Sequence, residues 1–145
     1  MTGWAHMEAE KAFARAARAR RRAALRCRLL RRRACQCGLL TVHAAHAPLQ
    51  RAAPAETGRR EIAVDAITAT LEPNRAAHFD DEFRPAAPAK ARWQRVWMAE
   101  ERGVPLPPIS VVPVRGGYAL RDGHHRVSVA RARGQATISA VVTAA

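Results

Sequence analysis

The first part of the chain has the hydrophobic and polar pattern of a long helix. Between about residues 7 and 34 the sequence contains neither Pro nor Gly, and Ala, Arg and Leu dominate it. These residue types have high helix propensity, so we predict one helix over this range. At helical spacing its apolar positions form a thin seam, made of Phe13, Ala16, Ala17, Ala23, Ala24, Cys27, Leu30 and Ala34. Another side of the helix collects cations, which are Arg15, Arg18, Arg22, Arg26 and Arg33.

The pattern changes after this helix. Gly38 is a helix stop, and residues 43–60 contain two Pro and much Ala without a clear hydrophobic period. Residues 1–60 are therefore expected to be a basic, Arg- and Ala-rich helix followed by a Pro- and Ala-rich linker. Residues 61–145 are expected to be a separate folded domain.

Short strand and helix patterns fill the second half and predict a compact α+β domain. The expected strands are residues 109–114, 118–121 and 136–143. Residues 61–67 are expected to be either a first strand or the entry from a strand into a helix. The expected helices are residues 89–102 and 126–133. A tight hairpin turn is predicted at residues 115–117, and a loop at residues 72–88. The expected aromatic anchors of the core are Phe79, Phe83, Trp93 and Trp97.

The positive charge is concentrated in the first half. The whole sequence has 25 basic and 12 acidic side chains. Residues 1–60 hold 14 of the basic and three of the acidic ones, so the second half is nearly neutral. A GC-rich genome explains Arg in place of Lys but does not explain the missing acids. The excess of basic over acidic side chains in residues 1–60 therefore predicts an acidic partner.

The apolar segments are too short for a membrane span or a secretory signal. No stretch approaches the roughly 18 consecutive apolar residues that a membrane-spanning helix needs. The three cysteines are an odd number and do not form a disulfide framework, which is typical of a reducing compartment. We expect a cytoplasmic protein, with association with the nucleoid as a further option. An organellar transit peptide is a minor alternative for the Arg-rich start.

Residues 121–130 carry the clearest chemical signal, with the sequence Arg-Asp-Gly-His-His-Arg-Val-Ser-Val-Ala. Unpaired amides and the helix dipole attract anions at the start of a helix. Gly123 would let an anion approach the backbone, and Arg126 can add a bidentate contact. Asp122 has three alternative roles, as a helix cap, as a partner that orients an imidazole, or as a ligand of a divalent cation. An ordinary turn before a helix has the same spacing, so an anion site and a plain turn both stay open.

The second half resembles the ParB/sulfiredoxin-like superfamily, and in particular bacterial ParB-like domains. The resemblance rests on the Leu-Pro-Pro-Ile segment at residues 106–109 and on the Asp-Gly-His-His-Arg-Val-Ser-Val-Ala segment at residues 122–130. It extends to residues 79–85 and to the helix of Trp93. The resemblance implies a nucleotide, CTP or ATP/ADP, as the cofactor, with Mg²⁺ as an optional companion. The phosphate-binding residues that it implies are Gly123, His124, His125 and Arg126.

The branches of this superfamily imply different chemistry. Sulfiredoxins have a reactive Cys at the position of His124, so reduction of a sulfinic acid is excluded here. Free-serine kinases share the Asp-Gly-His-His-Arg turn and use a Glu as base, for which Glu72 is the candidate. For an enzyme, either such a kinase or a nuclease, the expected catalytic residues are Glu72, Asp122 and His124. Partition proteins bind CTP and clamp DNA through a following helix-turn-helix domain, which we do not expect after Ala145.

The Arg-rich helix predicts salt-dependent contact with nucleic acid without sequence preference. Residues 11–33 contain 11 basic and no acidic side chains, which would displace counterions from DNA or RNA. The expected contacts are Arg15, Arg18, Arg22, Arg26 and Arg33. The alternatives are a solvated helix docked through its seam, an acidic partner protein and an anionic membrane surface.

A zinc site is the remaining metal hypothesis, and we do not expect one. Four potential ligands follow the helix, namely Cys35, Cys37, His43 and His46. The Cys-x-Cys spacing is poor for a tetrahedral zinc site, so small apolar cysteines are the better interpretation. The expectation is thus a ParB/sulfiredoxin-like α+β domain, preceded by a basic helix, that binds a nucleotide or phosphate and associates with DNA. The alternative is an enzyme of the same fold.

Overall fold

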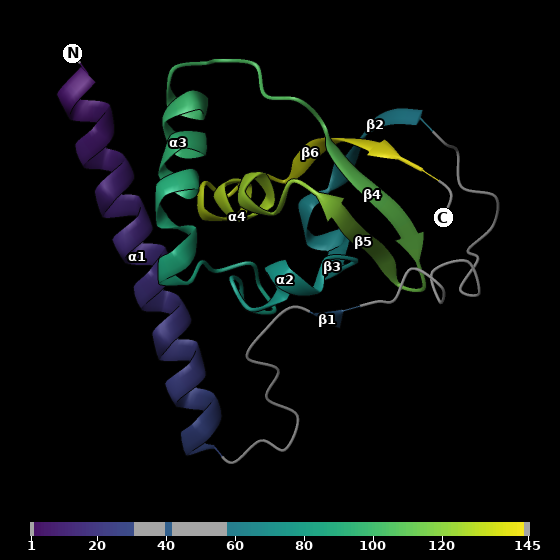
Figure 1. Cartoon of the computed structure of the whole chain (residues 1–145), viewed down its shortest axis with the longest axis horizontal. Helices are drawn as coiled ribbons and strands as arrows, with labels where there is room; N and C mark the ends of the chain where they lie inside the picture. Colours follow the sequence, from purple (N-terminus) through teal and green to yellow (C-terminus); the bar gives the residue numbers. More distant parts are fainter. Residues whose placement is uncertain (1, 31–39, 42–57, 144–145) are drawn as a thin grey trace.

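The computed structural model describes residues 2–30, 40–41 and 58–143 (Figure 1). The helices are α1 (Thr2–Leu29), α2 (Pro73–Ala76), α3 (Lys90–Glu101) and α4 (His124–Ala132), with 3₁₀ turns at Val64–Ala66 and Ala87–Ala89. The strands are β1 (Leu40–Thr41), β2 (Gly58–Ala63), β3 (Ile67–Thr70), β4 (Ile109–Val114), β5 (Gly117–Asp122) and β6 (Thr137–Val142). The α+β class predicted from the sequence is confirmed.

The strands form one mixed sheet in the order β1-β3-β5-β4-β6-β2. The predicted hairpin is confirmed, because β4 and β5 pair antiparallel. Of the two alternatives for residues 61–67, a single strand is wrong, because β2 ends at Ala63 and β3 begins at Ile67 after a 3₁₀ turn. This turn carries the chain from the edge strand β2 to β3, which pairs parallel with β5. Local alternation does not reveal such a change of position in the sheet.

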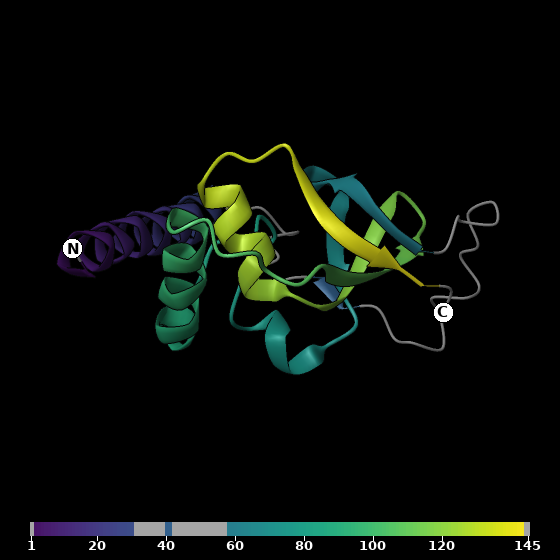
Figure 2. The ribbon, with the colours of Figure 1, turned by 90° about the horizontal axis from the view of Figure 1, so that it is seen from above.

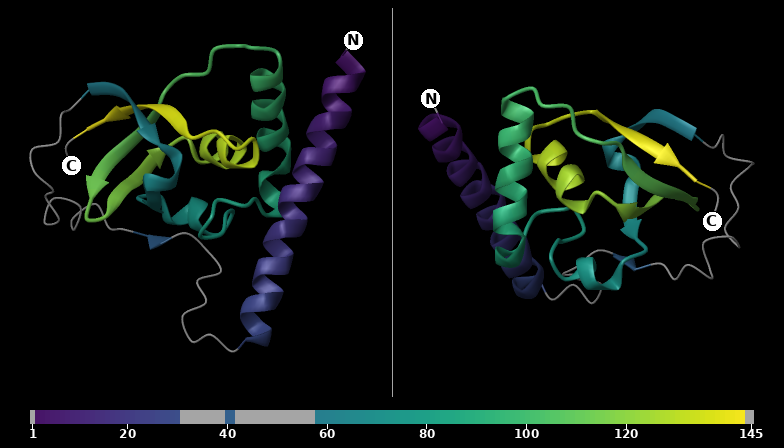
Figure 3. Two further views of the ribbon diagram at one scale, coloured as in Figure 1. Left: turned by 180° about the vertical axis from the view of Figure 1, so that it is seen from behind. Right: turned by 45° about the horizontal axis from the view of Figure 1, so that its top comes forward.

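The three longer helices lie in successive layers on one side of the sheet. Figures 1 and 2 show α4 next to the sheet, α3 beyond α4, and α1 outermost, and Figure 3 shows the same order from behind. Val127 and Ala130 of α4 belong to the main hydrophobic core. The other large members of this core are Ile62, Val64, Ile67, Phe79, Phe83, Ile109, Val111, Leu120 and Val142. The two phenylalanines are thus anchors, as expected.

A second hydrophobic cluster attaches α1 to α3. The ring of Phe13 meets Trp93 edge-on at 5.6 Å, and Trp97 stacks on Trp93 at 5.7 Å. The small buried side chains of α1 around this contact are Ala5, Ala9, Ala12 and Ala17. The predicted seam is therefore confirmed around Phe13, and it begins earlier in the chain than the sequence indicated, because α1 begins at Thr2.

The last turns of α1 depart from the predicted seam. Ala23, Ala24 and Cys27 are only half-buried, and Leu30 is 57% exposed. This part of the helix extends past the end of α3 (Figure 1), so α3 does not cover it. Ala34, the last expected member, lies outside the described residues. Cys27 is disulfide-bonded, which the sequence analysis did not predict.

Candidate anion-binding site

The turn between β5 and α4 requires the absence of a side chain at Gly123. This residue has a φ of +111°, in the left-handed region that favours glycine. A Cβ atom there would lie 2.5 Å from Cγ2 and 2.9 Å from Cβ of Ile109, too close for carbon atoms. Gly123 therefore lets β4 pack against the turn. We expected the glycine to open the backbone to an anion, but Ile109 occupies the side on which a Cβ would project.

The helix α4 begins without a side-chain cap. Its first internal hydrogen bond runs from the Val127 amide to the Gly123 carbonyl at 3.0 Å, and no side chain caps the helix. The amides of residues 124–126 thus lie at the positive end of a nine-residue helix. Asp122 does not act as the helix cap, because its carboxylate instead lies 3.1 Å from Nη2 of Arg126.

His124 is buried beside the end of β3. Its Nε2 lies 2.6 Å from Oγ1 of Thr70, and its ring stacks on Phe79 with 6.2 Å between centroids. Burial, and then the charge of Arg75, lowers the pKa of His124 to about 4. The imidazole is therefore neutral at pH 7 and can make hydrogen bonds without adding charge.

His125 is also buried and neutral. Its ring meets Phe79 edge-on at 5.2 Å. Burial, followed by the charges of Arg92 and Arg75, lowers the pKa of His125 to about 4. Arg75 belongs to α2 and Arg92 to α3, so guanidinium groups from two other helices lie close enough to influence this turn. Sequence reasoning missed both arginines, because they lie far from the turn along the chain.

The guanidinium of Arg126 is held by the chain itself. Its Nη1 donates to the carbonyls of Pro107 and Pro108, at 3.0 Å for Pro108, and its Nη2 pairs with Asp122. Only 14% of the Arg126 side chain is exposed. Arg126 thus fastens the Pro-rich segment before β4 to the start of α4. Its contact with phosphate stays a prediction, and a ligand would have to share or replace some of these bonds.

Glu72, the predicted catalytic base, lies close to His124 in the fold. It directly precedes α2, and its amide donates to Oγ1 of Thr70 at 2.9 Å. Thr70 therefore connects the backbone of Glu72 with the imidazole of His124. The Glu72 side chain is exposed, as is that of Asp122, which is 79% exposed. Thr70 had no recognisable signal in the sequence, because it ends a strand that the pattern did not predict.

Among the described residues, no three His, Cys, Asp or Glu side chains gather as a metal site requires. The zinc candidates Cys35, Cys37, His43 and His46 lie outside the described ranges. Near the turn, the two candidate acidic side chains are Asp122 and Glu72. Mg²⁺ that arrives with a nucleotide is commonly held by phosphate oxygens and water with only one or two carboxylates, which this pair can supply.

The chain resembles a sulfiredoxin structure. The similar structure is a crystal structure of sulfiredoxin from Arabidopsis thaliana, with 18% identity and a TM-score of 0.44. The match covers 60% of this chain and 85% of the sulfiredoxin chain. No family model and no curated protein matches the sequence.

The cationic face predicted for the first helix lies on the surface of α1. The side chains of Arg15, Arg18, Arg22 and Arg26 are all exposed. Their spacing of three or four residues places them on one side of the helix. The fifth expected contact, Arg33, lies outside the described residues. Within the ranges that the structure describes, no helix has both the length and the apolar character of a membrane span.

Proposed function

We propose that this protein is a ParB-like module that binds a nucleotide or phosphate at residues 122–126 and contacts nucleic acid through α1. The observation that carries the first part is the start of α4. Three uncapped amides, two neutral imidazoles and the nearby charges of Arg75 and Arg92 occur together there. Amides at a helix start and imidazole N–H groups donate to phosphate oxygens, and the arginines supply the compensating charge.

Isothermal titration calorimetry with CTP, ATP and ADP tests this proposal. Arg75→Gln removes one of the surrounding charges, and we expect it to weaken nucleotide binding at least tenfold. Arg102→Gln is the matched control, because Arg102 is an exposed arginine at the end of α3. If the wild-type protein binds none of the three nucleotides, the nucleotide part of the proposal is wrong. Titration with inorganic phosphate then tests the phosphate part in the same way.

A second measurement follows the imidazoles directly. A bound phosphate favours the protonated form of a nearby histidine and therefore raises its pKa. We expect the NMR titration curves of His124 and His125 to move to higher pH when CTP or phosphate is added. Binding without any change at these two rings would place the ligand elsewhere.

An enzyme of the same fold is the second candidate, either a small-molecule kinase or a nuclease. It is favoured by the link from the backbone of Glu72 through Thr70 to His124, which brings a carboxylate-bearing residue close to the proposed phosphate site. In this candidate Glu72 is the general base, while Asp122, His124 and His125 would position a metal-bound phosphate. Nucleotide turnover or nucleic-acid cleavage that is lost in Glu72→Gln would favour the enzyme. Nucleotide binding without either activity would favour the module.

The contact with nucleic acid is proposed from the exposed arginines of α1. Each guanidinium that neutralises a phosphate releases counterions, so binding should weaken steeply with salt and depend little on sequence. Binding titrations on duplexes of unrelated sequence at several salt concentrations measure this slope. We expect Arg18→Gln, Arg22→Gln and Arg26→Gln each to reduce the slope by about one. Arg121→Gln, an exposed arginine on β5, should leave the slope unchanged.

A further inference from the structure

A cavity of about 610 Å³ lies between α1 and the second half of α4. Its walls come from α1, from Asp65, from residues 82–85, from the last turns of α4 and from residues 134–136. None of its lining residues belongs to residues 122–126, and Glu72 does not line it either. The cavity is therefore separate from the proposed phosphate site. Its volume is in the range of pockets that bind small molecules.

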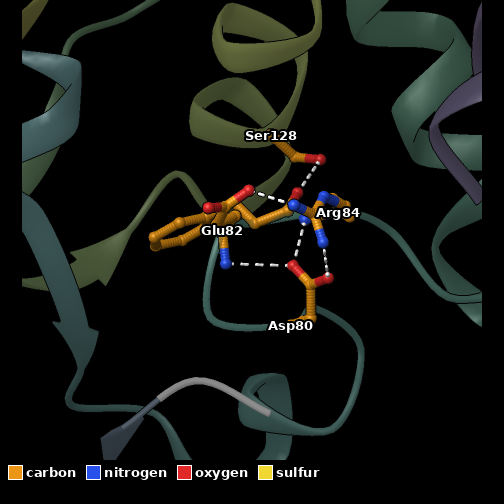
Figure 4. Close-up of polar contacts among 5 residues, drawn as sticks. Asp80, Glu82, Arg84 and Ser128 are labelled. Atoms are coloured by element: carbon orange, nitrogen blue, oxygen red, sulfur yellow. Dashed lines mark hydrogen bonds and ion pairs between the residues drawn. The ribbon is translucent and has the colours of Figure 1, made fainter. Parts of the chain in front are cut away.

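A buried carboxylate holds one wall of this cavity in a fixed shape (Figure 4). Oδ1 of Asp80 accepts hydrogen bonds from the amides of Glu82 and Arg84 at 3.0 and 2.8 Å, and Oδ2 pairs with Nη1 of Arg84 at 3.2 Å. Phe83 has a φ of +60°, and its carbonyl accepts a hydrogen bond from Oγ of Ser128 at 2.5 Å. A non-glycine residue in this conformation persists only where its surroundings impose it. The loop is thus a preformed wall.

Three arginines from different segments of the chain line the cavity, namely Arg15, Arg84 and Arg131. They differ in whether the guanidinium group already has an ion-pair partner. Arg84 is paired with both Asp80 and Glu82. Arg15 is exposed and has no ion-pair partner within the described part of the chain. Arg15 is therefore able to bind an anion without breaking an existing pair.

Arg131 is held only weakly by the chain. Its Nη1 lies 3.8 Å from the carboxylate of Asp65, whose side chain is 96% exposed, so solvent screens this pair. Its Nη2 lies 3.4 Å from the carbonyl of Ile67, at the long limit of a hydrogen bond. Its Nε is buried and has no hydrogen-bond partner among the described residues. The long contacts of its two Nη atoms leave this guanidinium with capacity for an anionic ligand.

The remaining lining combines polar and small apolar side chains. The two carboxylates in it, Asp65 and Glu82, are those that pair with Arg131 and Arg84. Ala12, Ala16 and Ala19 of α1 also line the cavity, as does Phe83, whose ring centroid lies 5.6 Å from the guanidinium of Arg131. Alanines keep this wall flat and leave the volume that a larger side chain would fill. A flat apolar group can lie against such a wall, with a negative group toward the two arginines.

We propose that this cavity binds a small organic anion with a flat apolar body, whose carboxylate, sulfonate or phosphate pairs with Arg15 and Arg131. The ligand contacts α1 as well as the α+β domain. By mass action it therefore stabilises the docking of α1. This proposal stands independently of the phosphate site at the start of α4.

The probe for the experiment is 8-anilinonaphthalene-1-sulfonate, which has an aromatic body and one sulfonate. We expect saturable binding with one site per chain, measured by fluorescence and calorimetry on the full chain. The uncharged parent, N-phenyl-1-naphthylamine, should bind at least tenfold more weakly. Arg131→Gln and Arg15→Gln should each lower the affinity for the sulfonate about tenfold and leave the affinity for the uncharged parent nearly unchanged.

Two further variants separate this cavity from other surfaces. Arg18→Gln is the matched control for Arg15, since both are exposed arginines of α1 and only Arg15 lines the cavity. Arg18→Gln should not change the affinity for the sulfonate. Ala19→Trp should fill the cavity and abolish binding without lowering the thermal unfolding midpoint, because Ala19 is exposed.

Excess CTP should not displace the probe from the cavity. An absence of probe binding can therefore be distinguished from an absence of nucleotide binding at the phosphate site.

Several results would overturn the proposal. The first is a wild-type protein that shows no saturable binding of the sulfonate. The second is wild-type affinity in Ala19→Trp, which would place the probe elsewhere. The third is an equal loss of affinity for the sulfonate in Arg18→Gln and Arg15→Gln, which would show a general effect of positive charge rather than binding in this cavity.

Discussion

At the scale of single residues, Gly123 and Ile109 form the contact that determines the turn before α4. The left-handed backbone of Gly123 and the close approach of Ile109 are two separate reasons for glycine at this position. Gly134, which follows α4, has a φ of +71° but nothing within 4 Å of the place where its Cβ would lie. Alanine substitutions at the two positions can therefore be compared. At Gly134 only the backbone conformation opposes a Cβ atom, whereas at Gly123 the packing against Ile109 opposes it as well.

Gly123→Ala should destabilise the protein more than Gly134→Ala. We expect Gly134→Ala to lower the free energy of unfolding by about 1 kcal/mol, the cost of a left-handed residue with a Cβ. For Gly123→Ala we expect about 3 kcal/mol, because Ile109 must also move. Chemical denaturation of the two variants measures both values. Equal losses would show that packing against Ile109 contributes nothing.

The buried histidines predict a loss of stability in acid. In the unfolded chain His124 and His125 bind protons near pH 6.5, whereas in the folded protein their pKa values are about 4. The unfolded state therefore binds more protons below pH 6.5, and the stability that is complete above this pH is lost as the pH falls to 4. We expect a loss of about 2–3 kcal/mol for each imidazole. Asp80 opposes this at the acid end, because burial raises the pKa of its carboxyl.

Denaturation at a series of pH values between 7.5 and 4 measures this loss. NMR titration of the assigned imidazole resonances provides a check that does not depend on unfolding. Resonances of His124 or His125 that titrate near pH 6.5 in the folded protein would contradict the prediction.

The Asp-Gly-His-His-Arg motif predicted the local structure of the site but not its distant contacts. The Asp-Gly-His-His-Arg motif correctly placed a turn before a helix, because glycine and the helix pattern are local signals. It did not reveal that Arg126 donates to Pro107 and Pro108, since that contact depends on how the segment before β4 crosses the turn. Nor did it indicate Arg75, whose charge lowers the pKa of both histidines.

At the scale of elements, the docking of α1 on α3 depends on one large side chain among alanines. The edge-on contact between Phe13 and Trp93 is the centre of this interface, and Val129 of α4 belongs to the same cluster. Trp93 also donates from Nε1 to Oγ of Ser128 at 2.8 Å. The contact thus links three helices in a row, from α1 through α3 to α4.

Phe13→Ala should release α1 from the domain. We expect a loss of about 3–4 kcal/mol in the free energy of unfolding and a red shift of tryptophan fluorescence as Trp93 becomes exposed. Met7→Ala is the control on the same helix, because Met7 is 55% exposed, and it should change stability by less than about 0.5 kcal/mol. Unchanged fluorescence in Phe13→Ala would mean that α1 does not depend on this contact.

At the scale of the whole molecule, the two proposed activities lie on different parts of the structure. The exposed arginines of α1 are on the outermost helix, whereas the start of α4 is an inner layer next to the sheet (Figure 1). The excess charge of the chain lies mostly in residues 1–60, of which α1 is the first part. Long-range attraction to a polyanion should be sensitive to salt, while a short-range site of amides and imidazoles should be much less so.

Salt should therefore separate the two activities. Four phosphate contacts on α1 predict that nucleic-acid affinity falls about a hundredfold between 50 and 200 mM salt. We expect the affinity for CTP to change less than tenfold over the same range, because the site is largely buried. Parallel titrations with a duplex and with CTP test this. A parallel loss of both affinities would mean that they share one charged surface.

The sequence by itself determined the features that depend on neighbouring residues along the chain. These include the helix propensity of the Ala- and Arg-rich start, the hairpin β4–β5, the turn before α4, the concentration of charge in the first half and the α+β class. Local periodicity and turn chemistry are sufficient for each of these. The tertiary structure alone decided which distant groups meet. It placed Thr70 against His124 and Ile109 against Gly123, and it brought Arg15 and Arg131 into the lining of one cavity. Such contacts follow from the packing of whole elements, to which no local pattern refers.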